Sequence, residues 1–233
     1  MRPGGMLDRL ISVVYPKTCV LCGQVVRATD LWCGECALPL PRGPLCPRCG
    51  MEKDCCVCRH ARFAFSRAVA PFVYRGNLRL QLLDLKKRPN ERLCRFLAGE
   101  MCAVLREIYP EDFFDVIVPV PAVGGRNHAE ELARAVAAKT GVPLAPRALT
   151  RLPKSRVQHS LGLENRFKNA KASYEIQNGQ VVAEKRVLLV DDILTTGATA
   201  HFCARSLLRA GAAQVDVLTA SCTAGNTNKV KFV

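Results

Sequence analysis

The chain has 233 residues, of which 49% are hydrophobic, so we expect a folded protein with one substantial α/β domain and a small extra module. Its net charge of +14 favours anionic ligands, either polyphosphates or nucleic acid, without choosing between them. No apolar run approaches the length of a membrane span. The opening segment is too short for a signal peptide, and the charged residues Asp8 and Arg9 interrupt it. Thirteen cysteines without an export signal then indicate a reducing compartment, so we expect a cytoplasmic location.

The cysteines near the start of the chain form four Cys-x-x-Cys pairs: Cys19/Cys22, Cys33/Cys36, Cys46/Cys49 and Cys55/Cys58. Two such pairs complete a closed tetrahedral thiolate site of the structural zinc type, so the spacing predicts about two zinc ions. Consecutive pairs close the shortest loops, which favours one site from the first two pairs and one from the last two. An interleaved pairing and a single zinc ion with loose thiols remain open. Cys56 is an alternative to Cys55, and His60 is a weaker spare ligand.

Near Arg62 the cysteines thin out and periodic elements begin. This change divides the chain into an N-terminal helix with a double zinc ribbon, residues 1–61, and an α/β domain, residues 62–233. Short apolar runs predict strands at 68–74, 115–118, 187–190 and 214–220, with a turn at Gly76-Asn77. Apolar residues at helical spacing predict helices at 78–87, 93–108, 127–140 and 198–210, the third capped by Asn127 and stopped by Gly141. Four further cysteines are expected as small core residues: Cys94, Cys102, Cys203 and Cys222.

The strand predicted at 187–190 is continuously apolar, as in a parallel sheet buried on both faces, and it is followed at once by Asp191 and Asp192. These carboxylates are expected at the carboxyl edge of the sheet, where open α/β sheets bind ligands. The loop Thr195–Thr199 then offers hydroxyls and a glycine just before a helix, whose amino end favours phosphate. Two adjacent carboxylates suit the neighbouring hydroxyls of a diol. A ligand with a diol and a phosphate is a phosphorylated ribose, so the stretch predicts a site for one. The alternative is an acidic turn and a helix cap with no ligand.

Two further segments are expected beside this edge. Pro119-Val120-Pro121 cannot extend a central ladder, so a loop must begin there on the same side of the sheet. The segment 147–171 holds seven basic residues and one acid and is expected to be a mobile cationic loop. Its side chains either fold over a pyrophosphate group or form a solvated surface: Arg151, Lys154, Arg156, Arg166 and Lys168.

With its two acids and Thr195-Thr196-Gly197 turn, the stretch 187–199 resembles the phosphoribosyl pyrophosphate (PRPP) loop of type I phosphoribosyltransferases. With the cysteine pairs and the Val118–Pro121 turn, the whole chain resembles the ComF family of bacterial competence-associated phosphoribosyltransferase-like proteins. The resemblance implies a type I phosphoribosyltransferase-like fold with a central parallel sheet. One departure is the segment Ala122–Gly125, which is shorter than the family's approach to an RGFNQA-like turn, here replaced by Gly125–Ala129.

The resemblance also implies roles for individual residues. Asp191 and Asp192 would hydrogen-bond the ribose hydroxyls, and the loop would bind the 5′-phosphate. The implied PRPP-binding set is Asp191, Asp192, Leu194, Thr195, Thr196, Gly197, Ala198, Thr199, Pro119, Val120 and Pro121. In an enzyme of this class, magnesium and basic groups stabilise the departing pyrophosphate, so the catalytic set would be Asp191, Asp192, Lys154 and Arg156.

Three functions follow as hypotheses. The first is a phosphoribosyltransferase-like protein that binds PRPP-type ligands and acts in natural competence and DNA uptake, together with competence proteins. The second is an active phosphoribosyltransferase acting on an unidentified base or amine. The third is a non-catalytic scaffold or single-stranded DNA-binding protein, which would bind DNA weakly through 147–171 and Lys86-Lys87-Arg88.

Overall fold

The computed structural model describes residues 16–56, 58, 62–122, 126–152 and 174–223, with the side chain of Cys55 outside the description. The predicted helix near the N-terminus and the C-terminal tail therefore lie outside the described residues. Within them, no helix combines the length and the hydropathy that crossing a bilayer requires.

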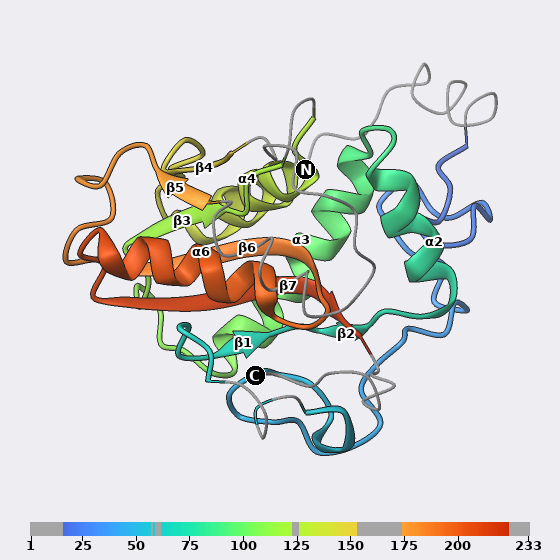
Figure 1. Cartoon of the computed structure of the whole chain (residues 1–233). Coiled ribbons are helices and arrows are strands. Elements are labelled where there is room, and N and C mark those ends of the chain that lie inside the picture. Colours follow the sequence, from blue (N-terminus) through green and yellow to red (C-terminus); the bar gives the residue numbers. More distant parts are fainter. Residues whose placement is uncertain (1–15, 57, 59–61, 123–125, 153–173, 224–233) are drawn as a thin grey trace, which may run out of the picture.

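A parallel sheet forms the centre of the molecule (Figure 1). Its order is β1-β7-β6-β3, and β2 also pairs with β7. The strands are β1 (Ala68–Val69), β2 (Phe72–Val73), β3 (Val116–Pro119), β6 (Arg186–Leu194) and β7 (Gln214–Cys222). The α/β class and the parallel sheet expected from the sequence are confirmed.

Helices cover both faces of this sheet, as the continuous apolar run of β6 predicts. Val187 and Leu189 belong to a core with α6 (Ala198–Arg209), whereas Leu188 and Val190 belong to a second core on the other face. The second core contains α2 (Gly76–Leu85), α3 (Glu91–Arg106) and α4 (His128–Thr140). Cys94, Cys102, Cys203 and Cys222 are buried in these cores, as expected.

Several element boundaries differ from the sequence predictions. The edge strand at 68–74 is split into β1 and β2 around Pro71, which has no backbone N–H to donate. The turn expected at Gly76-Asn77 is the first turn of α2 instead, and α3 ends at Arg106, which leaves Ile108 39% exposed. Part of the segment expected as a cationic loop is the strand β4 (Leu149–Arg151), which pairs antiparallel with β5 (Tyr174–Ile176).

The helix α4 follows the predicted capping chemistry. Asn127 Oδ1 accepts hydrogen bonds from the backbone N–H groups of Ala129 and Glu130, at 3.2 and 3.4 Å. Gly141 ends the helix in the left-handed conformation, with φ of 75°. The first residue of α4, His128, is thereby fixed beside the sheet.

The cysteine-rich segment does not stand apart from the sheet. Cys19 is buried in the core that contains α2 and α3, whereas Cys49 and Met51 are buried in the core that contains α6. In Figure 1 the blue segment accordingly runs past α2 and then below β1. A backbone hydrogen bond of 2.7 Å from Ala68 to the Arg48 carbonyl joins the second part of this segment to β1. The domain boundary near residue 62 stays a prediction.

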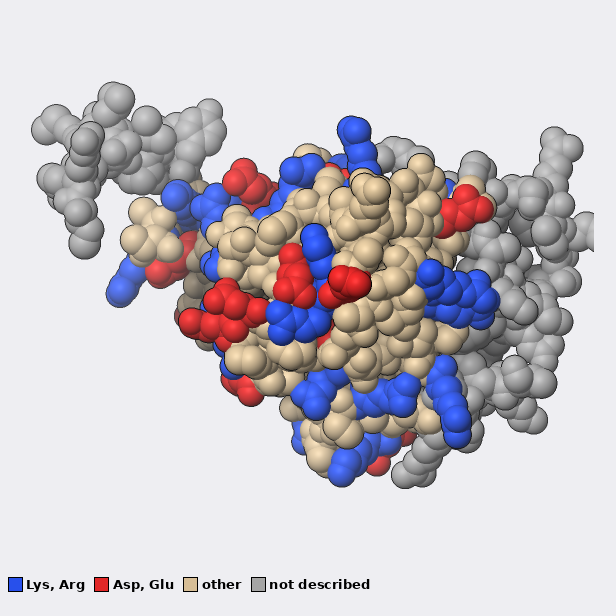
Figure 2. Space-filling model, turned by 90° about the vertical axis from the view of Figure 1, so that its left-hand side faces the viewer, with Lys and Arg blue, Asp and Glu red and all other residues tan. Residues whose placement is uncertain are grey.

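Basic side chains are spread unevenly over the surface. In Figure 2, which shows the left-hand side of Figure 1, Lys and Arg predominate in the lower and right parts of the described surface. Asp and Glu are interspersed with them in the middle and on the left. On this face the excess of positive charge is therefore not a single continuous patch.

Candidate functional site

The acid pair lies where one neighbouring strand stops and the other continues. The pairing of β3 with β6 ends at Pro119 and Val190, whereas the pairing of β6 with β7 runs on through Asp191 to Leu194. The sequence predicted that the strand would end at Val190, and this was wrong because the strand continues to Leu194, with ladder partners on β7 for Asp191, Ile193 and Leu194. On the β3 side Pro119 still belongs to the ladder, and the Val120 N–H donates to the Val190 carbonyl at 2.9 Å, so the predicted loop begins after Pro119 rather than at it. The two acids therefore lie at an open step in the sheet edge.

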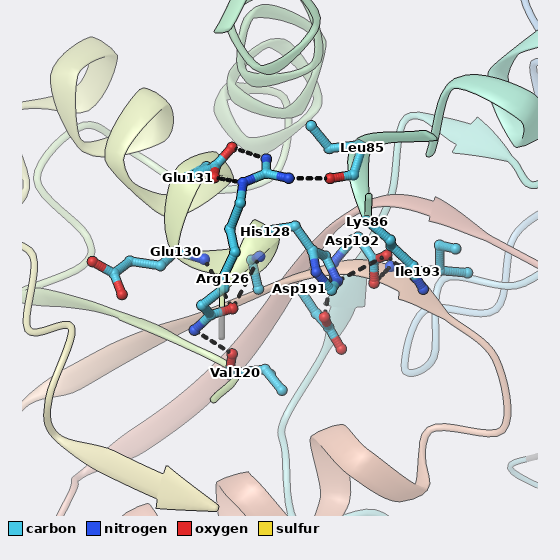
Figure 3. A network of polar contacts seen from close by, with 12 residues as sticks. Leu85, Lys86, Val120, Arg126, His128, Glu130, Glu131, Asp191, Asp192 and Ile193 are labelled. Carbon is cyan, nitrogen blue, oxygen red and sulfur yellow. Dashed lines mark hydrogen bonds and ion pairs between the residues drawn. The ribbon is translucent and has the colours of Figure 1, made fainter. Parts of the chain in front are cut away.

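Asp192 is held by two side chains from different helices (Figure 3). Its Oδ2 atom lies 2.9 Å from Nζ of Lys86, at the end of α2, and 3.2 Å from Nε2 of His128. Its Oδ1 atom accepts a 2.8 Å hydrogen bond from the backbone N–H of Ile193. The side chain is only 6% exposed, so this carboxylate has a fixed position.

Asp191 has a different environment, although it is adjacent in sequence. Its Oδ1 atom accepts a 2.9 Å hydrogen bond from the backbone N–H of Asp192. Burial, and then the neighbouring charge of Asp192, raise the pKa of Asp191. Burial also acts to raise the pKa of Asp192, but the hydrogen bond from His128 and the charge of Lys86 lower it overall. The surroundings therefore shift the pKa values of the two adjacent carboxyl groups in opposite directions.

A second set of contacts fixes the helix ends that carry Lys86 and His128. Arg126 forms a bidentate ion pair with Glu131 of α4, and its Nη1 donates a 2.6 Å hydrogen bond to the carbonyl of Leu85. Asn127 Nδ2 donates to the Val120 carbonyl at 3.1 Å, which joins the start of α4 to the turn after β3. The ends of α2, α4 and β3 are thus connected around the acid pair (Figure 3).

The loop after β6 leads through Gly197 directly into the helix α6. Gly197 is the N-cap of α6 and has φ of 74°, a left-handed conformation that favours glycine. Thr196 Oγ1 accepts from the backbone N–H of Ala198 at 3.4 Å. The side chain of Thr195 is exposed, and that of Thr199 is partly exposed. The amino end of α6 lies just beyond these hydroxyls, so its partial positive charge is directed at the loop.

The loop is supported from outside by Phe63. A Cβ on Gly197 would lie 2.7 Å from the Phe63 ring, so only glycine allows this close approach. The Phe63 carbonyl accepts a 2.8 Å hydrogen bond from Arg48 Nη2, and the adjacent Ala64 N–H donates to His201 Nδ1 at 3.0 Å. The cysteine-rich segment that contains Arg48 is therefore in contact, through Phe63, with the loop.

Two groups of cysteines could each hold one metal ion. The first is Cys19, Cys22, Cys33 and Cys36, and the second is Cys46, Cys49, Cys56 and Cys58. The measured Sγ–Sγ distances are 3.6–3.9 Å, far longer than the roughly 2.05 Å of a disulfide. A tetrahedron with zinc–sulfur bonds of about 2.3 Å has edges of about 3.8 Å, so both groups fit a closed zinc site.

The grouping agrees with the consecutive pairing favoured by the sequence, with one difference. In the second group Cys56 lies where Cys55 was predicted. The side chain of Cys55 lies outside the described residues, so its role as a ligand stays a prediction. Cys56, Cys58 and Cys46 are partly buried and Cys49 is buried, which places this group against the core.

Other predicted site residues lie partly outside the description. Lys154, Arg156, Arg166 and Lys168 fall in the segment 153–173, which is not described. Arg151 is described, and its guanidinium lies 5.6 Å from the centre of the Tyr174 ring. Sequence reasoning missed Lys86 and His128 as partners of the acid pair. The only signal for them in the sequence is their position, since Lys86 lies near the end of the helix predicted at 78–87 and His128 follows the Asn127 cap.

Comparison with known proteins agrees with this geometry. Residues 100–230 match the Phosphoribosyl transferase domain family. Because this match covers more than half of the chain, the protein belongs to the phosphoribosyltransferase domain family.

Two curated proteins are similar to this chain over most of its length. The chain is 30% identical over 223 residues to the DNA utilization protein YhgH of Salmonella typhimurium, covering 88% of this chain and 96% of that protein. It is 26% identical over 240 residues to the competence protein ComFC of Bacillus subtilis, covering 90% and 93%. The ComF resemblance predicted from the sequence is confirmed. A solved adenine phosphoribosyltransferase is 20% identical, with 62% of this chain and 75% of that chain covered and a TM-score of 0.41.

The cysteine geometry predicts the outcome of metal analysis. The purified full chain should contain about two zinc ions, and Cys56→Ser should lower this to about one because the second tetrahedron loses a ligand. Cys55→Ser is the matched control and should retain about two. Zinc content measured by atomic emission would contradict the Cys56 assignment if only the Cys55 variant lost metal. A content near zero in the unaltered chain would reject both sites.

The environments of the two acids predict opposite effects on stability. An acid with a raised pKa in the folded state contributes less stability as pH rises through that pKa. Asp191→Asn should therefore raise the Tm of the ligand-free protein at neutral pH by a few degrees. Asp192→Asn should lower Tm, because Lys86 and His128 lose their carboxylate partner.

Thermal unfolding between pH 4 and 8 would measure both effects. The advantage of Asp191→Asn should be small near pH 4, where the unfolded carboxyl is also protonated, and should grow toward neutral pH. Two variants with the same change in Tm at every pH would contradict the unequal environments.

Proposed function

We propose that this protein binds PRPP, or a related ribose 5-phosphate, at the carboxyl edge of the central sheet. The proposal rests on the order of the polar groups at the end of β6, where two carboxylates are followed by a hydroxyl-rich loop and the amino end of a helix. The paired carboxylates of Asp191 and Asp192 are followed within a few residues by the Thr195–Thr199 loop at the amino end of α6. Carboxylates accept hydrogen bonds from a diol, and a helix amino end with loop N–H groups binds phosphate.

The two ends of such a ligand would contact different parts of the site. The ribose hydroxyls would meet the acids, and the 5′-phosphate would meet the hydroxyls of Thr195, Thr196 and Thr199. The turn Pro119–Pro121 borders the same open step, on the side where β3 stops, and would face the pyrophosphate. Magnesium would enter with the pyrophosphate and neutralise its charge.

We further propose a role in DNA uptake or DNA use. The support comes from the relatives, whose names are DNA utilization protein and competence protein and which match nearly the whole chain. Catalysis is a second step, since transfer of the phosphoribosyl group also needs an acceptor and cations at the leaving pyrophosphate. Lys154 and Arg156 are proposed for that task.

Ligand binding should appear as a shift in Tm. A ligand bound only by the native state at about a hundred times its Kd stabilises by about 2.7 kcal/mol. For a chain of this size that is roughly 5–10 °C. PRPP with magnesium should produce such a shift, and Asp191→Asn with Asp192→Asn should remove most of it. Each charge-assisted hydrogen bond lost contributes about 1.5–3 kcal/mol.

A matched control for this double variant is Glu111→Gln with Asp112→Asn. These two acids are also neighbours in sequence, but they are exposed and lie between α3 and β3, away from the loop. The control should keep the full shift. Differential scanning fluorimetry with PRPP, and with pyrophosphate alone, would test the proposal. An unchanged PRPP shift in the Asp191/Asp192 variant would show that the ribose is not held by the acids.

The ion pairs of the described residues weaken one of the two basic segments through which the protein was expected to bind single-stranded DNA. Of the basic run Lys86-Lys87-Arg88, Lys86 pairs with Asp192, and Arg88 lies 2.6 Å from Asp84. Two of the three cations are thus engaged with carboxylates, which weakens this run as a site for phosphate. The remaining basic segment of that hypothesis lies largely outside the described residues.

A further inference from the structure

Three side chains at the sheet edge are close enough together to bind one divalent cation. One ligand atom each from His128, Asp191 and Asp192 lie within 4.8 Å of one another. Two carboxylates and an imidazole are donors that Mn²⁺ and Mg²⁺ accept, the imidazole favouring the transition metal. The donors come from adjacent positions on β6 and from the first residue of α4.

A lysine already interacts with this group. Nζ of Lys86 lies 2.9 Å from Asp192 Oδ2, the same oxygen that His128 approaches at 3.2 Å. A lysine side chain carries a positive charge at neutral pH. A divalent cation bound to the same oxygen would lie close to this charge and would be repelled by it.

The position of Lys86 is determined by the fold rather than by a flexible surface contact. The carbonyl of the preceding residue, Leu85, accepts the 2.6 Å hydrogen bond from Arg126, which Glu131 holds in place. Leu85 itself is buried. The side chains of Lys86 and its neighbour Lys87 are both exposed, Lys86 by 42%, but Nζ of Lys86 reaches the buried carboxylate of Asp192. Figure 3 shows Lys86 and His128 both directed toward Asp192.

We propose that Lys86 is the resident cation of the acid pair, which it positions by occupying the place that a divalent metal ion would otherwise take. In the ligand-free protein the pair then binds no metal of its own. This inference rests on the proposed function for its biological meaning, because it assigns magnesium to the pyrophosphate end of the ligand. Lys86 acts through Asp192 and is a positioning residue.

Neutralising the lysine should convert the site into a metal site. In Lys86→Met the full-length, zinc-loaded protein should bind one Mn²⁺ at least about tenfold more tightly than the unaltered chain, since the competing ammonium is gone. Lys87→Met removes the same charge one residue along and should gain nothing. Lys86→Arg keeps the charge and should also gain nothing. Adding Asp192→Asn to Lys86→Met should abolish the gained site.

Electron paramagnetic resonance of free Mn²⁺, titrated without PRPP, would measure this gain. The cysteine groups do not compete, because thiolates select zinc over manganese. If Lys86→Met fails to fold by circular dichroism, Lys86→Gln replaces it as the neutral variant. A gain in the neutral variant that depends on Asp192 supports the proposal.

Two outcomes would overturn the proposal. One is a folded neutral variant that binds Mn²⁺ no better than the unaltered chain. The other is an unaltered chain that already binds Mn²⁺ in a manner lost with Asp192→Asn. Because the titration contains no PRPP, a failure here is separate from a failure of the proposed ribose site, which is measured by the PRPP-dependent shift in Tm.

Discussion

Two carboxylates placed next to each other at the end of a buried strand are the constraint on which the rest of the site depends. Buried like charges repel, and each loses its hydration, so both cannot be ionised without compensation. The protein resolves this unequally: Lys86 and His128 compensate Asp192, whereas Asp191 has a raised pKa. The helix ends that supply these partners are in turn fixed by Arg126 and Asn127. A site with this arrangement is preorganised before any ligand arrives.

The cysteine groups are part of the same architecture rather than an appended module. One contributes to the core under α2 and α3, the helices that lead to Lys86 and pack near α4. The other contributes to the core under α6, and the hydrogen bond from Arg48 to the Phe63 carbonyl connects it to the loop at Gly197. Zinc bound at these groups would therefore stabilise both faces of the sheet whose edge carries the acids. A closed set of four thiolates leaves no open position, so this role is structural and not catalytic.

Membership of the phosphoribosyltransferase domain family accounts for the sheet edge but not for the whole chemistry. Phosphoribosyl transfer is mainly a matter of positioning and of stabilising charge, and in the proposed function the acids with the adjacent loop would provide the positioning. The residues proposed to act on the pyrophosphate, Lys154 and Arg156, come from another part of the chain. Binding of a phosphoribosyl ligand and transfer of it are therefore separable parts of the proposal, and each can be tested without the other.

The sequence alone determined what depends on local pattern. The apolar run before Asp191, the Thr-Thr-Gly turn, the Asn127 cap and the Cys-x-x-Cys pairs are all signals carried within a few residues, and the strand, helix and site edge followed from them. Only the tertiary structure decided which distant residues meet. Lys86 looked like one cation in a basic run, and His128 like part of a shortened turn, until the packing of α2 and α4 brought both to Asp192. The contact of Phe63 with Gly197 was decided in the same way, because hydrophobic burial sets it and the spacing of neighbouring residues does not encode it.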